Sequence, residues 1–124
     1  MSGKALIIGN SDGIGLATTR VLLERGWKIV GISRSASPIA NPSYAHIVAE
    51  VQTDAYPTRL KSVLQKEAPV DLCVFCAGIG EMLDLADIDR ETQIIHVNLL
   101  AMVKTASLVI PMMVKRGKGH FIGL

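Results

Sequence analysis

A glycine-rich turn close to the amino terminus has residue types and a spacing suited to binding phosphate. The turn follows a short apolar run, precedes a stretch with helical periodicity, and reads Gly9-Asn10-Ser11-Asp12-Gly13-Ile14-Gly15. Glycine lets the chain turn sharply and lets backbone approach a pyrophosphate, while the amino terminus of the following helix supplies partial positive charge. Ser11 can add a hydroxyl to a phosphate oxygen. The pattern predicts a dinucleotide-binding turn, and a tight turn without a ligand is the alternative.

A second group of residues could select which dinucleotide binds. Ser33, Arg34 and Ser35 lie at the end of the second expected strand, and Ser33 follows Gly13 by twenty residues. An NAD site has an acidic side chain at this place for the ribose hydroxyls, whereas a 2′-phosphate is held by arginine. No acid stands here, Arg34 offers a fork of donors, and the serines offer hydroxyls. We therefore expect NADP(H) to be favoured over NAD(H), with a plain surface arginine as the alternative.

Strands that alternate with helices are expected to position these residues. Apolar runs predict five strands, at Lys4–Gly9, Trp27–Ile32, His46–Val51, Val70–Cys76 and His120–Leu124. Apolar spacing predicts helices at Gly13–Arg25, at Pro57–Glu67, and from about Asp89 to Arg116 with a bend at Pro111. Ser33–Ser43 and Gly78–Ile88 are expected to be loops. The alternation predicts a Rossmann-type, doubly wound parallel α/β sheet of order 3-2-1-4-5, with a ligand site at its carboxyl edge beside the first strand.

The composition and the remaining reactive residues argue against several classes of function. The net charge is +2 and aromatic residues make up 4% of the chain, which gives no basis for a nucleic-acid partner. Cys73 and Cys76 would point to opposite faces of a strand, and His46, His96 and His120 lack the spacing of metal ligands, so no metal site is expected. Two cysteines make no disulfide framework and no signal peptide precedes the first strand, so we expect a cytoplasmic protein.

The longest apolar stretch, Ile94–Val114, approaches the length of a membrane span. Lys104 lies near its centre, where a lysine costs about 2.5–3.5 kcal/mol on insertion. We therefore expect a buried or subunit-facing helix and no membrane association. Because the stretch is apolar on more than one face, one sheet cannot bury it alone, which predicts self-association through the 89–116 helix.

Taken in order, these segments resemble the short-chain dehydrogenase/reductase family. Its glycine motif TGxxxGIG is matched from Gly9 to Gly15, with Ile8 in place of the threonine. The resemblance places Glu50-Val51 at the family's Asp-Val pair beside the adenine, and Cys76-Ala77-Gly78 at its NNAG segment, without the two asparagines. Asn98 matches the family's structural and catalytic asparagine. The resemblance covers the whole chain but only the amino-terminal half of the family's domain, so residues 1–124 are expected to form an NADP(H)-binding half-domain.

The resemblance implies hydride transfer between a nicotinamide cofactor and a carbonyl or alcohol substrate. The family's proton transfer uses a serine and a Tyr-x-x-x-Lys, with the asparagine holding a water in the relay. Here Tyr44 is followed four residues later by Val48 and Tyr56 by Leu60, so only Asn98 is matched. The 124 residues alone are therefore expected to be inactive.

Two other functions remain open at this point. One is a non-catalytic dinucleotide-binding or regulatory module. The other is a methyltransferase-type nucleotide domain, which is also rich in glycine after its first strand. That class has an acidic residue for the ribose at the end of its second strand, where this chain has Arg34. In the resembled family the long helix forms part of a dimer interface, which again implies a homo-oligomer.

Overall fold

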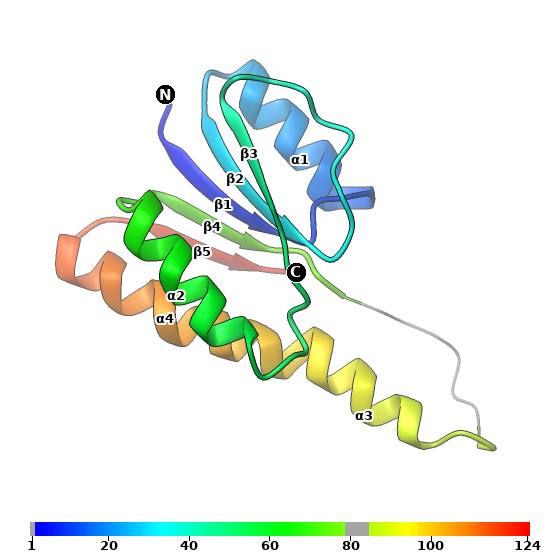
Figure 1. The fold of residues 1–124 in the computed structure, drawn as a ribbon. Helices are drawn as coiled ribbons and strands as arrows, with labels where there is room; N and C mark the ends of the chain where they lie inside the picture. The colour runs from blue at the N-terminus through cyan, green and yellow to red at the C-terminus, as the bar shows by residue number, and fades with distance from the viewer. Residues whose placement is uncertain (1, 79–84) are drawn as a thin grey trace.

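The computed structural model describes residues 2–78 and 85–124, which form a five-stranded parallel sheet with helices on both faces (Figure 1). The strands are β1 (Lys4–Ile8), β2 (Lys28–Ser33), β3 (Tyr44–Val48), β4 (Leu72–Phe75) and β5 (His120–Gly123). The helical segments are α1 (Gly13–Glu24), α2 (Tyr56–Glu67), α3 (Asp89–Ile95), the π-helical turn η1 (His96–Leu100) and α4 (Ala101–Arg116). The spatial order β3-β2-β1-β4-β5 confirms the predicted topology.

The two faces of the sheet carry separate apolar cores. On one face, Leu22 and Leu23 of α1 pack near Ala5, Ile7 and Ile29, as the strand alternation of side chains requires. On the other face, α2 and α4 cover a larger core, and a buried hydrogen bond of 2.7 Å joins Tyr56 of α2 to Thr105 of α4. The uniformly apolar strands predicted from the sequence are therefore explained by cover on both sides.

The third strand differs from the prediction in its position. It spans Tyr44–Val48 and not His46–Val51, because it pairs with β2 from Tyr44 opposite Ile29 to Val48 opposite Ser33. Since β2 ends at Ser33, the chain beyond Val48 has no partner strand and turns away. This shift brings Tyr44 onto the sheet, and it leaves Glu50 in the connection that leads to α2.

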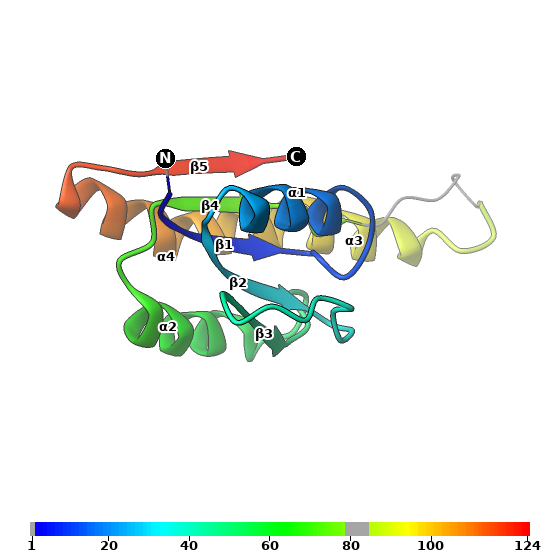
Figure 2. The same ribbon diagram turned by 90° about the horizontal axis from the view of Figure 1, so that it is seen from above.

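The long helical stretch contains an irregularity that the sequence did not predict. A π-helical turn at His96–Leu100 separates α3 from α4, while helical residues continue past Pro111 to Arg116. Figure 2 shows α3 and α4 running as one rod alongside β4, with α3 beyond the carboxyl ends of the strands. By length and composition alone Asp89–Arg116 could also cross a membrane, a test that core helices of soluble proteins pass as well. In the fold its buried face packs on the sheet.

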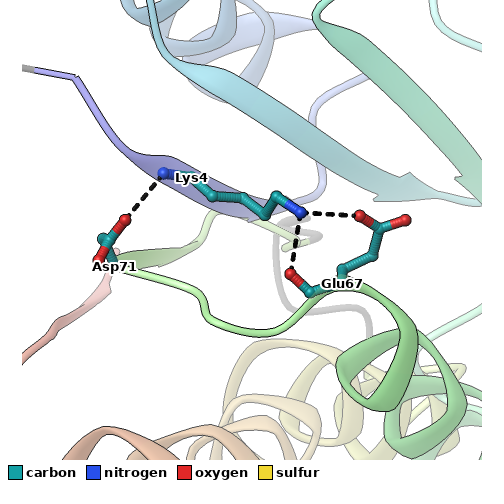
Figure 3. Close-up of polar contacts among 3 residues, drawn as sticks. All are labelled: Lys4, Glu67 and Asp71. Carbon is teal, nitrogen blue, oxygen red and sulfur yellow. Dashed lines mark hydrogen bonds and ion pairs between the residues drawn. The ribbon is translucent and has the colours of Figure 1, made fainter. Parts of the chain in front are cut away.

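Polar contacts fasten the edge of the sheet where the strands begin. The Lys4 backbone N–H donates to the Asp71 carboxylate at 3.0 Å, and the Lys4 ammonium contacts the carbonyl and carboxylate of Glu67 at 3.0 and 3.1 Å (Figure 3). Arg116 donates to Asp71 as well, at 3.2 Å. These contacts join β1, the end of α2, the start of β4 and the end of α4, and they leave the opposite edge of the sheet for a ligand.

Candidate cofactor site

A pocket of about 240 Å³ lies where the carboxyl ends of β1, β2 and β4 meet the connections that follow them. Its lining residues are Gly9, Ser11, Asp12, Ile32, Ser33, Arg34, Ser35, Ala49, Glu50, Val51, Gln52, Cys76, Ala77, Gly78, Gln93 and Val97. Predicted residues from each of four connections, those after β1, β2, β3 and β4, thus lie in one cavity. In open parallel sheets, this edge beside the central strand is the usual place for a ligand.

The glycine turn is built by close contact of backbone with backbone. Gly9 has φ +85° and lies so near Ala77 that a side chain at Gly9 would overlap the backbone after β4. Gly15 packs in the same way against the backbone of Gly9, at the point where α1 leaves the sheet. Helix α1 begins after Asp12 with no side-chain cap and no acidic residue in its first turn. Its first backbone N–H groups therefore remain without side-chain partners, as a phosphate site requires.

Not every residue of the predicted turn lines the pocket. Ser11 and Asp12 do, whereas Gly13, Ile14 and Gly15 do not, and the side chain of Ile14 is 68% exposed. The side chain of Asn10 is completely buried and points away from the pocket, donating to Thr19 at 3.1 Å and to the Tyr44 hydroxyl at 2.9 Å. The amide of Asn10 thus acts inside the protein.

The segment after β2 is held from within and presents its arginine outward. Ser33 is buried, and its hydroxyl donates to the Ser35 carbonyl. Both serines also contact His46 of β3, to which the sequence assigned no role. Arg34 is exposed and has no hydrogen-bond or ion-pair partner among the residues that the structure describes. Its fork of donors is available to an anion at the mouth of the pocket.

The segment after β3 contributes one wall of the pocket. Val51 is buried beneath the pocket and Glu50 is exposed at its rim, so the predicted pair is divided between core and solvent. Gln93 of α3 donates to Gln52 at 3.3 Å. Gln52, Gln93 and Val97 had not been singled out from the sequence. The position of Gln52 directly after Glu50-Val51 was the only available signal.

The segment after β4 lies at the base of the pocket. Cys73 packs in the core under α2 and α4, while Cys76 packs toward the α1 side, which confirms that the two thiols face opposite ways. Burial raises the pKa of Cys73 to about 12, and it raises the pKa of Cys76 as well, so neither sulfur is a ready nucleophile. Gly78 faces Asn98, whose amide oxygen would lie 3.1 Å from a side chain at that glycine.

Asn98 itself lies in the π-helical turn, one residue after Val97, which lines the pocket. A π turn offsets the residues that follow it relative to a regular helix, and such turns are frequent at functional sites. Asn98 does not line the pocket. It stands beside Gly78 at the pocket's base. The predicted loop between Gly78 and Ile88 lies in part outside the described residues, which resume at Leu85.

Solved structures share this architecture over nearly the whole chain. A short chain dehydrogenase from Leptospira borgpetersenii serovar Hardjo-bovis with bound NAD+ superposes with a TM-score of 0.85 at 18% identity, covering 97% of this chain and 50% of that one. ElxO with NADP bound gives a TM-score of 0.83 at 17% identity, covering 99% and 55%. At this identity the likeness establishes the fold.

Curated proteins match this chain at higher sequence identity than these solved structures do. A short chain dehydrogenase of Penicillium brasilianum, ausX, is 33% identical over 130 residues, which cover 96% of this chain and 49% of that protein. This chain spans about half the length of curated relatives that it matches. The family described as short chain dehydrogenase matches residues 3–123. With this match and the glycine turn, sheet order and carboxyl-edge pocket in place, the chain belongs to the short chain dehydrogenase family.

Proposed function

We propose that this chain forms the cofactor-binding part of an NADP(H)-dependent oxidoreductase that interconverts a carbonyl and an alcohol. The observation that carries the proposal is the exposed Arg34 at the mouth of the pocket, directly after β2 and without a partner among the described residues. A guanidinium in this place suits the 2′-phosphate of NADP(H). Membership of the short chain dehydrogenase family supports the reaction class.

Different residues of the pocket would bind different parts of the cofactor. The glycine turn and the uncapped start of α1 would hold the pyrophosphate through backbone N–H groups, with Ser11 adding a hydroxyl. Arg34 would hold the 2′-phosphate, and Ala49–Val51 would form the wall beside the adenine. Two carboxylates, Asp12 and Glu50, also line the pocket and are able to accept bonds from ribose hydroxyls. A test of cofactor choice therefore has to compare NADP+ and NAD+ directly.

The bound nicotinamide cofactor supplies or accepts a hydride in this reaction class. Cys76, Ala77 and Gly78 would pass along the cofactor at the base of the pocket, which all three residues line. Asn98, fixed beside Gly78 by the π turn, is the described residue best placed to hold a water or a hydroxyl near the reacting end. Its role would be to orient a proton carrier while the hydride moves.

A second function, a dinucleotide-binding module without catalysis, is favoured by one observation. The sequence has two tyrosines, and neither is placed to transfer a proton to a substrate. Tyr56 is buried against Thr105, and burial raises the pKa of its hydroxyl. Tyr44 contacts His46 at 2.6 Å, and neither tyrosine lines the pocket. Turnover of a simple ketone with NADPH by the whole gene product would decide against this alternative.

We further propose that the chain self-associates in the cytoplasm through the long helix. An exposed apolar stripe recurs on the side of α3, η1 and α4 away from the sheet. We call this stripe the helix stripe, and its residues are Ile95, Leu99, Val103, Ile110 and Val114. Water-exposed apolar side chains in such a row are a usual sign of an interface. Neither a membrane nor a nucleic-acid partner is part of the proposal.

The cofactor preference is tested by replacing Arg34. We expect Arg34→Gln to weaken NADP+ binding about 10- to 100-fold, the effect of losing a hydrogen bond to a charged group, and to change NAD+ binding little. Arg25→Gln, at the far end of α1, is the matched control and should change neither affinity. Isothermal titration calorimetry with both cofactors gives the numbers. Equal effects on NADP+ and NAD+, or none, would refute the assignment of Arg34.

A further inference from the structure

A chain of polar contacts runs beneath α1 from the glycine turn to the segment that carries Arg34. Asn10 donates to the Tyr44 hydroxyl at 2.9 Å, and Tyr44 contacts Nδ1 of His46 at 2.6 Å. Nε2 of His46 lies 2.9 Å from the Ser35 carbonyl and 3.0 Å from the Ser33 hydroxyl. We call this series the polar chain. It connects the two loops that the proposed cofactor would touch at opposite ends of its adenosine diphosphate part.

One arrangement of protons gives every donor of the polar chain an acceptor. The Ser35 carbonyl can only accept, so the proton of the His46 ring belongs on Nε2. Nδ1 must then accept, and the Tyr44 hydroxyl donates to it. The hydroxyl oxygen in turn accepts from the Asn10 amide, whose other hydrogen goes to Thr19. The Thr19 hydroxyl donates a hydrogen bond to the Gly15 carbonyl. Each donor of the polar chain has an acceptor, whereas the buried Oδ1 of Asn10 has no hydrogen-bond partner among the described residues.

The sheet makes room for this network at one position. Gly31 lies opposite His46 in the register of β2 and β3. A side chain at Gly31 would overlap both the Tyr44 hydroxyl and the Asn10 amide. A glycine inside a strand weakens it and often marks the close approach of another group. Here the group is the polar chain, which is therefore a part of the packing beneath α1.

The polar chain fixes the backbone on both sides of Arg34. Ser33 and Ser35 direct their polar groups inward to His46, while Arg34 between them remains exposed. We propose that His46 is a positioning residue for cofactor choice, which presents Arg34 to a 2′-phosphate by holding Ser33–Ser35 in one conformation. The inference rests on the proposed NADP(H) site. Without His46 the turn would have to be ordered when the cofactor binds, and binding through Arg34 would weaken.

The test separates the two ring nitrogens of His46. His46→Ala should weaken NADP+ binding about fivefold to tenfold and leave NAD+ binding within about twofold, since only NADP+ gains from a fixed Arg34. His46→Gln places an amide N–H near the Nε2 position and should restore most of the affinity. His46→Asn places an amide near Nδ1 only and should not. Calorimetry with NADP+ and NAD+ measures the ratio, and urea denaturation checks that each variant is folded.

A second readout makes the inference independent of the cofactor. The backbone N–H of Ala49 donates to the Ser33 carbonyl at 3.0 Å, so its hydrogen exchange reports on the segment that His46 holds. Measured without ligand, exchange of the Ala49 amide should quicken in His46→Ala and return toward the wild-type rate in His46→Gln. Equal losses for NADP+ and NAD+ would mean a general structural role and would overturn the inference. Unchanged exchange would overturn it as well. A wild-type protein with no preference for NADP+ would refute the proposed function, and the exchange rates would then still decide whether His46 holds the turn.

Discussion

Two glycines in the glycine turn should respond very differently to the same substitution. Gly9 and Gly13 both have positive φ, +85° and +55°. A side chain at Gly13 would meet nothing within 4 Å, whereas one at Gly9 would collide with the backbone of Ala77. Comparing Gly9→Ala with Gly13→Ala therefore separates two contributions to the free energy of unfolding: the unfavourable backbone conformation, which both variants share, and steric overlap, which only Gly9→Ala has.

The expected magnitudes follow from these surroundings. A left-handed conformation costs an alanine about 1–2 kcal/mol, and Gly13→Ala should lose about that much free energy of unfolding. Gly9→Ala carries the same cost and must also displace the backbone between Cys76 and Ala77, for which overpacking suggests about 1–3 kcal/mol more. The atoms in the way are backbone and cannot move aside as a flexible side chain would. We therefore expect Gly9→Ala to lose about 2–5 kcal/mol in all.

Urea denaturation followed by the fluorescence of Trp27, the single tryptophan, measures both variants. Trp27 packs against the core beneath α1, so its signal reports on that side of the sheet. The difference between the two unfolding free energies is the quantity of interest. If Gly9→Ala costs no more than Gly13→Ala, the close packing of the turn on Ala77 is wrong, and so is the geometry of the pocket built on it.

Two further predictions concern the opposite edge of the sheet and the long helix. The backbone N–H of Lys4, aided by Arg116, holds the pKa of Asp71 below its usual value of 3.8. Ionised Asp71 therefore stabilises the fold above pH 3.8, and this stabilisation is lost as the pH falls through the lowered pKa. Asp71→Asn should then cost about 1 kcal/mol at neutral pH and little in strong acid, by urea denaturation, and an equal cost at both would contradict the pKa assignment. Val103→Asp on the helix stripe should shift sedimentation toward smaller species while Lys66→Asp on α2 should not, and a wild-type monomer at micromolar concentration would exclude self-association.

The fold followed from the sequence because its signals were local. Apolar runs and helical spacing located all five strands and the main helices, and the right-handed connection of parallel strands fixed their order. The end of β3 could not be predicted in this way. It is set by where β2 stops at Ser33, which is a property of the pairing and not of residues 49–51. The π turn at His96–Leu100 likewise leaves no mark in the apolar pattern.

The sequence predicted the parts of the candidate site that are formed by backbone, and it predicted less well which way the side chains point. Gly9, Arg34 and Gly78 line the pocket because their places at strand ends are dictated by the topology. Asn10 was predicted to contact the ligand. Its amide instead lies over Gly31, where no side chain blocks it, and donates to the Tyr44 hydroxyl. That space arises only when β2 and β3 are paired. His46 was passed over for the same reason, since Ser33 and Ser35, which it contacts, come from the end of β2 and the segment that follows it.

The central claim, that NADP(H) binds at the carboxyl edge of this sheet, is tested most directly by nuclear magnetic resonance. Titration of the isotope-labelled protein with NADP+ should shift the backbone amides of Gly9–Asp12, Ser33–Ser35 and Glu50–Gln52. The amides around Lys4 and Asp71, at the other edge, should stay in place. Shifts centred away from the pocket, or none at saturating NADP+, would contradict the claim.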